Sequence, residues 1–298
     1  MRIVVTGGTG FIGRALVARL LQAGHSVVAI TRRPEAAREA LGLGEAYAWA
    51  DLTDAFAVPV DAVVHLAGES VKGYWTKAKV EEVWESRIWT TKAVVEAVAQ
   101  APVAPAVLLS ASGIGYFGDA GESVLEEGAT PGKDYFAQLC VEWESLVLGA
   151  GLANVRTVCA RFGIVLGNGG GALPMMALPA KTGLSGPLGS GRQWWSWISL
   201  DDAVRALIHV MDRPELQGSV NVVSPEPIRQ AEFQKQLGSA LGRPAFIPAP
   251  AFGVRMLLGK FADEVLSSKR VVPSALAASG FVWESADLST LLERLLRR

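Results

Sequence analysis

The chain has 298 residues, half of them hydrophobic, and its 28 basic and 29 acidic side chains leave a net charge of −1. This balance gives no electrostatic reason to expect nucleic acid or an anionic membrane as a partner. The two cysteines lack metal-ligand spacing and the three histidines add little, so no metal site is predicted, and this usage favours the cytoplasm.

Short apolar runs alternate with longer helical patterns through the first half of the chain. Continuous apolar strands separated by helices indicate a parallel sheet covered on both faces. We therefore predict an α/β protein with a doubly wound, Rossmann-like sheet. Strands are expected at 2–6, 26–31, 46–50, 62–67, 106–112 and 155–162, and helices at 11–23, from about 34, at 76–99 and at 134–149.

The alternation weakens after residue 163. A helix is expected after Ser199, where Asp202 follows three residues later as in a capping box, and a strand at 219–223 comes next. The remainder is mostly helical, with proline-rich breaks. We predict a dinucleotide-binding domain at 1–165, to which 197–223 return, and a smaller C-terminal substrate domain formed by 166–196 and 224–298.

A glycine motif lies between the first predicted strand and helix. Gly7, Gly10 and Gly13 form G-x-x-G-x-x-G within "VVTGGTGFIG". Glycines permit a tight turn and a close backbone approach, and the following helix N-terminus favours a pyrophosphate. An ordinary glycine-rich turn is the alternative, and the strand–helix context disfavours it. The predicted phosphate-binding residues are Gly7, Thr9, Gly10, Phe11, Ile12 and Gly13.

The second predicted strand ends in "ITRRPE". A chain that selects NAD usually places an acidic residue about 20 residues after the glycines, to bind the ribose hydroxyls. Thr31, Arg32 and Arg33 stand there instead. Two guanidinium groups suit a 2′-phosphate, although a solvated basic turn is the alternative. The sequence therefore predicts NADP (NADPH) in preference to NAD.

Five further segments occur in the order expected for one superfamily: "WADLTD", "HLAG", "SASGIGYFG", "RFGIVLG" and "WISLDDAV". With the glycine motif they resemble the extended short-chain dehydrogenase/reductases, which include sugar-nucleotide epimerases and dehydratases. The resemblance implies that Asp51 and Leu52 contact the adenine, that Leu66, Ala67 and Gly68 line the cofactor, and that Arg161 belongs to an arginine-containing turn beside it.

Finer details resemble one branch of this superfamily. The segments "HLAGES", "SRIWTTKAVVEA", "GSGRQWWSWISLDDAV" and "LGKFADEVLSSKRVVPSALAASGF" are similar to the atypical members called epimerase family proteins, which carry a small C-terminal domain. The likeness covers nearly the whole chain. It does not specify a substrate. The superfamily also implies a possible homodimer through the helices at 76–99 and 134–149.

The catalytic pair of the superfamily is incomplete. Its Tyr acts as acid or base, and a Lys four residues later lowers the pKa of that Tyr. Ser112 and Tyr135 match the Ser and Tyr positions, but Leu139 stands at the Lys position, with Cys140 beside it. Glu69, just past a strand end, is a further candidate for proton transfer. Each candidate also has a structural alternative: close packing for Ser112, aromatic packing for Tyr135 and loop capping for Glu69.

Three other positions are open to two interpretations. Arg87 is expected to form a structural ion pair, with a substrate carboxylate or phosphate as the alternative. Trp195 and Trp197 share one strand face and are expected to pack in the core between the domains, with a pocket wall as the alternative.

The leading hypothesis for function is an NADP-dependent oxidoreductase or epimerase-like enzyme that acts on an unidentified small molecule. Hydride passes between the nicotinamide and a substrate carbon, and Ser112 polarises the oxygen. The first alternative is an NADPH-binding sensor or regulatory protein without catalysis, which the absent Lys favours. The second is an NAD-dependent sugar-nucleotide epimerase, which Arg32 and Arg33 disfavour.

Overall fold

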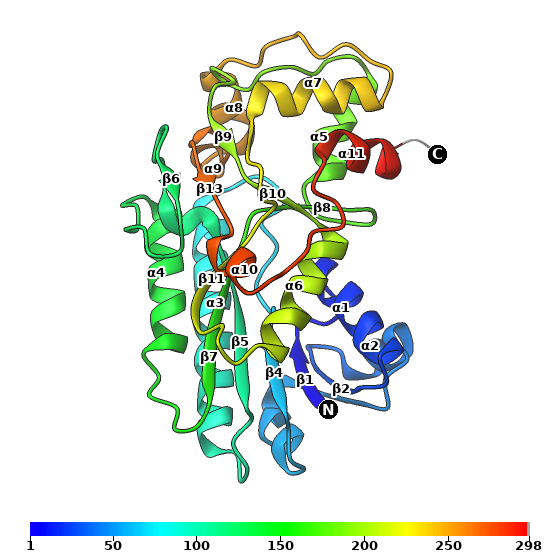
Figure 1. Ribbon diagram of the computed structural model, residues 1–298, viewed down its shortest axis with the longest axis vertical. Helices are drawn as coiled ribbons and strands as arrows, with labels where there is room; N and C mark the ends of the chain where they lie inside the picture. Colours follow the sequence, from blue (N-terminus) through cyan, green and yellow to red (C-terminus); the bar gives the residue numbers. More distant parts are fainter. Residues whose placement is uncertain (297–298) are drawn as a thin grey trace.

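A computed structural model describes residues 1–296, so the last two residues of the predicted 224–298 segment lie outside the described part. Its centre is a seven-stranded sheet in which every pairing is parallel (Figure 1). The doubly wound α/β prediction is confirmed. The strands are, in spatial order, β11 (Gly218–Val222), β7 (Arg156–Phe162), β5 (Val107–Gly113), β4 (Ala62–His65), β1 (Arg2–Thr6), β2 (Ser26–Ile30) and β3 (Glu45–Tyr47).

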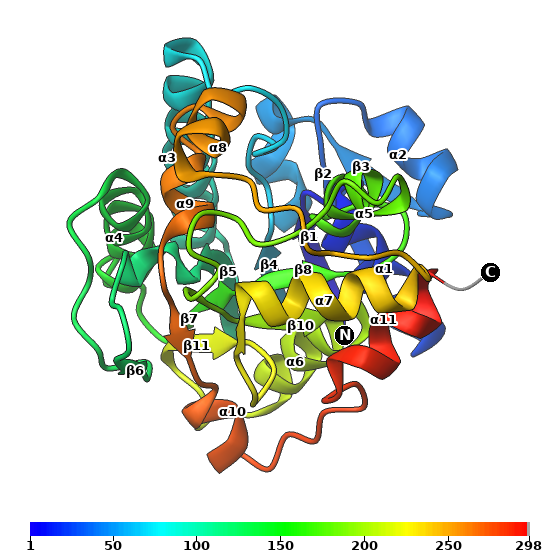
Figure 2. The same cartoon turned by 90° about the horizontal axis from the view of Figure 1, so that it is seen from above.

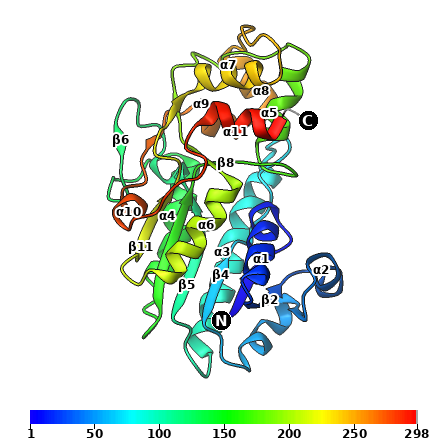
Figure 3. The same cartoon turned by 45° about the vertical axis from the view of Figure 1, so that its right-hand side comes forward.

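Both faces of the sheet are covered because its strands are apolar on both sides. Ile3 and Val5 of β1 pack in one core cluster, whereas Val4 between them packs in the other. Figure 3 shows helices α1 and α6 in front of the sheet and α3 behind it. The covering elements are α1 (Phe11–Gln22) and α6 (Leu200–Asp212) on one face, and η1 (Trp49–Phe56), α3 (Lys77–Gln100) and α4 (Tyr135–Leu148) on the other.

A smaller layer lies over the carboxyl ends of the strands (Figure 2). Its core holds Trp195, Trp197 and Phe233, each at most 7% exposed, so the two tryptophans are core residues of the smaller layer rather than of an interface between domains. The remaining helices are α2 (Pro34–Leu41), η2 (Ile114–Phe117), α5 (Leu173–Lys181), α7 (Gln230–Ala240), α8 (Ala251–Leu258), α9 (Ala262–Leu266), α10 (Ser274–Ala278) and α11 (Leu288–Leu296). Three short strand pairs are β8 (Ile164–Leu166) with β10 (Trp197–Ser199), β9 (Trp194–Trp195) with β12 (Ile228–Arg229), and β6 (Val124–Leu125) with β13 (Arg270–Val271).

The first turn of α6 ties the C-terminal segment to the sheet. The Ser199 hydroxyl accepts a hydrogen bond from the Asp202 amide at 2.9 Å, as the capping box predicts. The Asp202 carboxylate in turn accepts bonds from the backbone amides of Glu284 and Ser285, each at 2.9 Å. This fully buried carboxylate therefore fixes the chain leading into α11 to the first turn of α6.

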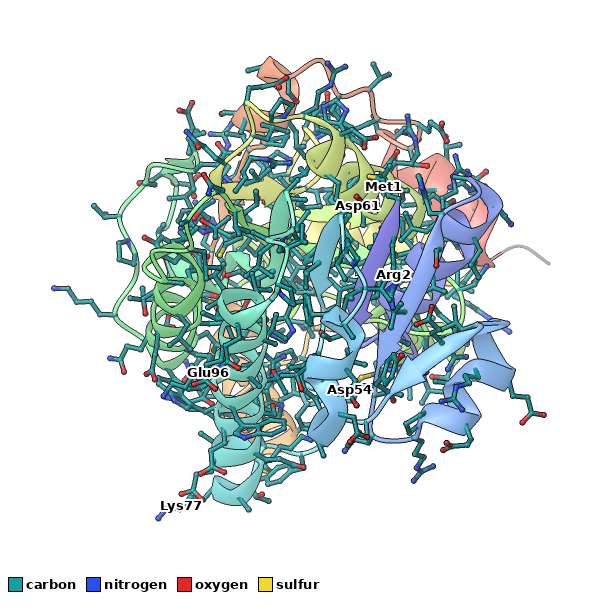
Figure 4. All side chains as sticks on the ribbon, turned by 90° about the horizontal axis from the view of Figure 1, so that it is seen from below. Met1, Arg2, Asp54, Asp61, Lys77 and Glu96 are labelled. Atoms are coloured by element: carbon teal, nitrogen blue, oxygen red, sulfur yellow. The ribbon has the colours of Figure 1, made fainter. Side chains whose placement is uncertain are left out.

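The amino ends of the strands are closed by local contacts. Figure 4 views the molecule from below and shows Met1, Arg2 and Asp61 close together. The Asp61 carboxylate accepts a hydrogen bond from the Arg2 amide at 2.6 Å. The carboxyl ends face the smaller layer, and ligands of open parallel sheets bind at that end. Within residues 1–296, none of the helices has the length and apolar character needed to cross a membrane.

Candidate functional site

The glycine loop joins β1 to α1 where the sheet changes winding direction, between β1 and β4. Gly7 has a φ of +69°, and a Cβ there would lie 2.7 Å from the Leu66 backbone. A Cβ on Gly13 would lie 2.2 Å from the Gly7 carbonyl oxygen. Gly10 is the N-cap residue of α1 and offers no side-chain acceptor, so the first-turn amides are left for another acceptor. This geometry fits a pyrophosphate at a helix N-terminus.

A cavity of about 660 Å³ opens beside this loop, within the size range of small-molecule sites. It lies at the carboxyl ends of β1, β2 and β4, the place predicted for a dinucleotide. The predicted cofactor residues that line it are Gly7, Thr9, Gly10, Thr31, Arg32, Leu66, Ala67 and Gly68.

A second cavity of about 480 Å³ lies next to the first, between the end of β2 and helix α2. Thr31, Arg32 and Arg33 line it together with three alanines of α2. Among residues 1–296, neither guanidinium group of this arginine pair forms an ion pair or donates a hydrogen bond. Two free cations beside a small opening fit a phosphate group.

An aromatic pair that the sequence analysis missed also lines the large cavity. The rings of Trp49, at the start of η1, and Trp89, on α3, lie 5.4 Å apart. Ser86, Trp89 and Thr90 reach the cavity together because spacings of three and four residues share one helix face. That spacing was visible within the predicted helix at 76–99. Ile30 and Ala48 complete the lining residues that were not predicted.

Asp51 and Leu52 lie farther along η1 and do not line either cavity. Asp51 is exposed, and Leu52 is 5% exposed in the core beneath the sheet. The turn of η1 brings Trp49 to the cavity instead. The contact of Asp51 and Leu52 with the adenine stays a prediction.

Phe11 and Ile12 occupy the first turn of α1 but not the cavity lining. Phe11 packs under the glycine-rich loop at 167–171, where a Cβ on Gly170 would lie 2.5 Å from its ring. Their side chains are thus set by packing, and only their backbone amides are placed to meet a phosphate.

Ser112 and Arg161 meet in a buried ion-pair network. They are register partners on β5 and β7, and both reach Glu144 of α4. Ser112 donates to Glu144 Oε1 at 2.6 Å, and Arg161 donates through Nε at 2.8 Å and Nη2 at 2.7 Å. Neither residue lines the cofactor cavity. The network satisfies both side chains internally.

Tyr135 lies within an aromatic cluster at the start of α4. Its hydroxyl donates to the Val80 carbonyl oxygen at 2.6 Å, and its ring contacts Trp75 and Trp84. Burial raises the pKa of Tyr135, and the nearby Arg87 only partly opposes that effect. The phenol is therefore protonated at neutral pH and engaged with the backbone.

The position of the missing lysine is filled by packing. Leu139 is 3% exposed in a cluster with Phe136, and Cys140 is buried beside the end of β5. Burial is the main cause that raises the pKa of Cys140 to about 12, so its thiol is neutral. Neither residue supplies a positive charge.

Glu69 lines the large cavity, and its carboxylate lies 2.6 Å from Lys79 Nζ. The hydrogen bond from Lys79 is the main cause that lowers the pKa of Glu69. Glu69 is therefore ionised at neutral pH and suits the role of an acceptor better than that of a proton donor.

Comparison with known proteins places the chain in a family. The model of the NAD dependent epimerase/dehydratase family matches residues 3–223, and a domain of unknown function, DUF1731, matches residues 249–295. The chain belongs to the NAD dependent epimerase/dehydratase family. The resemblance to the extended short-chain dehydrogenase/reductases, and to their epimerase family protein branch, is thereby confirmed.

Members of this family resemble the chain over nearly its whole length. Epimerase family protein Mb2239 of Mycobacterium bovis is 41% identical and covers 94% of the chain and 92% of that protein. The chloroplastic SDR39U1 homolog of Arabidopsis thaliana is 36% identical over 100% of the chain and 87% of its own. The crystal structure of human SDR39U1 with NADPH matches with a TM-score of 0.91 and 33% identity, and covers 100% of both chains.

Proposed function

We propose that the chain binds NADP(H) and is an oxidoreductase or epimerase-like enzyme for an unidentified small molecule. The observation that carries this proposal is the pair of unpartnered arginines, Arg32 and Arg33, at the cavity beside the glycine loop. A 2′-phosphate supplies the anion that this pair lacks. The presence of NADPH in the related human structure supports the same cofactor.

Different residues of the chain bind different parts of the cofactor. The bound dinucleotide supplies or accepts the hydride. The amides at the start of α1 hold the pyrophosphate, Arg32 and Arg33 hold the 2′-phosphate, and Trp49 with Trp89 forms an aromatic wall for the adenine. These contacts fix the orientation of the cofactor in the cavity.

Catalytic roles for Ser112, Tyr135 and Glu69 stay predictions. The hydroxyl of Ser112 must leave Glu144, and that of Tyr135 must leave the Val80 carbonyl, before either contacts a substrate oxygen. Glu69 already lines the cavity and is ionised, so it is placed to accept a proton. Among the three, Glu69 needs the least rearrangement.

A sensor without catalysis is the second candidate, favoured by the apolar packing that replaces the lysine at Leu139 and Cys140. The two candidates differ in the fate of the nicotinamide and of the metabolites. An oxidoreductase oxidises bound NADPH, or reduces NADP, with some member of a broad metabolite panel. An epimerase-like enzyme converts a metabolite and regenerates the cofactor, whereas a sensor leaves both the nicotinamide and the metabolites unchanged. An NAD-dependent sugar-nucleotide epimerase remains disfavoured because NAD has no 2′-phosphate for Arg32 and Arg33 to bind.

Cofactor selectivity in arginine variants tests the proposal. We expect Arg32→Ser with Arg33→Ser to weaken NADPH binding at least about tenfold, equivalent to about 1.4 kcal/mol, and to leave NADH binding nearly unchanged. Arg19→Ser removes an exposed arginine of α1 outside both cavities and is the matched control. Equal loss of NADPH and NADH affinity in the double variant would overturn the 2′-phosphate assignment.

Location and assembly are also proposals. Two free, buried thiols at Cys140 and Cys159 suit a reducing compartment, and we place the protein in the cytoplasm. A homodimer through α3 and α4 remains a prediction, and sedimentation equilibrium measures it directly. The near-zero net charge gives no reason to propose nucleic acid or a membrane as a partner.

A further inference from the structure

Arg87 lies next to the cofactor cavity. It projects from α3 against the end of β4, where a Cβ on Gly68 would lie 3.3 Å from its side chain. Gly68 itself lines the cavity. The guanidinium carbon of Arg87 also lies 5.2 Å from the centre of the Trp143 ring on α4. Arg87 thus stands between the cofactor cavity and α4.

The guanidinium group of Arg87 is only partly satisfied. Its Nη1 donates to the carbonyl oxygens of Glu69 at 3.1 Å and Val83 at 3.0 Å. Within residues 1–296, its Nε and Nη2 donate no hydrogen bond and no carboxylate forms an ion pair with it. Three of the five N–H donors of an arginine are therefore free. The structural ion pair expected from the sequence is absent.

Another donor beside Arg87 is also unsatisfied. The indole Nε1 of Trp143 is buried without a hydrogen-bond partner in the described part of the chain. Buried polar groups without a partner are rare and point to a water, ion or ligand. Arg156 gives the contrast: it too lacks an ion pair, but its Nη1 and Nη2 both donate to carbonyl oxygens near the end of α6. The lack of an ion pair therefore does not by itself leave an arginine of this fold with unmet donors.

The charge of Arg87 reaches the place of the missing lysine. Its field acts against burial on the pKa of Tyr135 and on that of Cys140. Burial lowers the pKa of Arg87 itself, which is the cost of holding a cation there without a carboxylate. A bound anion offsets that cost.

We propose that Arg87 binds a carboxylate of the substrate through its free Nε and Nη2 edge. This edge has the fork geometry that binds a carboxylate through two parallel hydrogen bonds. The inference rests on the proposed function, because it places the carboxylate next to the nicotinamide end of the NADP(H) cavity. The substrate class is then a carboxylic acid with an oxidisable or reducible carbon close to that group. Arg87 also provides, from α3, the fixed positive charge that α4 lacks.

Small planar anions test this site without knowledge of the substrate. Formate and nitrate are titrated at constant ionic strength, balanced with chloride, and formamide is the neutral match for formate. The midpoint of thermal unfolding is measured with and without saturating NADPH. We expect a saturable rise of the midpoint with formate and nitrate, and none with formamide.

Variants assign the response to Arg87. Arg87→Met is expected to abolish it, and Arg87→Lys to weaken anion affinity at least about tenfold because a lysine lacks the bidentate fork. Arg255→Met removes an exposed arginine of α8 and keeps the wild-type response. A saturable response that persists in Arg87→Met, or no saturable response in the wild-type protein, overturns the proposal. NADPH binding is measured separately by tryptophan-to-nicotinamide energy transfer, so failure of the proposed function is distinguishable from failure of the anion site. Arg87→Lys replaces Arg87→Met in this test if Arg87→Met does not fold.

Discussion

Buried polar side chains explain why individual candidates differ from the pattern of the superfamily. Ser112 and Arg161 converge on Glu144, and His65 bridges Thr6 on β1 and Thr91 on α3. Each group is satisfied by a partner far away in sequence. At this scale a residue type in the expected place is not enough, because the partner decides whether the group is free to act.

His65 makes stability depend on pH. It is fully buried, and burial is the main cause that lowers its pKa from 6.5 to about 3. As the pH falls, His65 therefore takes up a proton in the unfolded chain before it does so in the folded protein. The contribution of neutral His65 to the free energy of unfolding is complete above pH 6.5 and is lost between pH 6.5 and pH 3. We expect a loss of about 2 kcal/mol between pH 8 and pH 5 from this residue.

Urea unfolding at pH 8, 6 and 5 measures this effect. His65→Gln keeps an amide that can bond to both threonines but cannot take up a proton. From pH 8 to pH 5, the free energy of unfolding of this variant should fall by about 2 kcal/mol less than that of the wild-type protein. Identical pH dependence in the two proteins would contradict the assignment of a neutral, buried His65.

The glycine loop with the start of α1 is the element that makes the cavity. Its shape depends on two contacts, those of Gly7 with the Leu66 backbone and of Gly13 with the Gly7 carbonyl. The same loop contains Gly8, where a Cβ meets nothing closer than the Val17 side chain at 3.4 Å. The chain therefore offers a matched pair of positions within one loop.

Alanine at Gly13 and alanine at Gly8 should differ in their effect on NADPH affinity. Gly13→Ala places a Cβ into the Gly7 carbonyl, so we expect at least about a tenfold loss of NADPH affinity together with reduced stability. Gly8→Ala should bind NADPH as the wild-type protein does. Fluorescence titration of both variants gives the comparison, and unchanged affinity in Gly13→Ala would show that the loop does not hold the cofactor.

Elements were predictable where local pattern determines them. The first strand at 2–6 has the same bounds as β1, Arg2–Thr6, and the helix at 134–149 differs from α4 by one residue at each end. Apolar runs and capping residues are local signals, and they define strands and helices before any tertiary contact is known. The doubly wound sheet and the phosphate loop follow from the same signals.

Side-chain contacts between elements were not predictable in this way. Glu144 lies 32 residues after Ser112, and nothing near either residue indicates their hydrogen bond. Trp49 rather than Asp51 reaches the cavity because of the turn of η1, whose phase a motif match does not reveal. The free Nε and Nη2 of Arg87 could not be predicted either, because they depend on which side chains of α3, α4 and the end of β4 reach the guanidinium group.

At the scale of the whole molecule, Asp202 couples the sheet to the C-terminal segment. Besides the amides of Glu284 and Ser285, its carboxylate accepts from Arg205 Nη1 at 2.7 Å. Asp202→Ala should reduce the free energy of unfolding by about 3 kcal/mol, because several bonds to one buried carboxylate are lost. Hydrogen exchange should also accelerate in the segment at 283–296.

Asp201 is the control for that prediction. Its side chain is 69% exposed and lies 3.6 Å from Arg294. Asp201→Ala should change stability by no more than about 0.5 kcal/mol. Equal effects of the two substitutions would mean that the Asp202 contacts do not hold the C-terminal segment in place.

NADPH selectivity is a property of the whole molecule, because it depends on the sheet, the glycine loop and the arginine pair together. Parallel titration of the wild-type protein with NADPH and NADH, followed by energy transfer from its nine tryptophans to the nicotinamide, measures it directly. We expect NADPH to bind at least about tenfold tighter, a difference of about 1.4 kcal/mol. Equal affinity for the two would contradict the role of Arg32 and Arg33, and absence of binding would contradict the cofactor site itself.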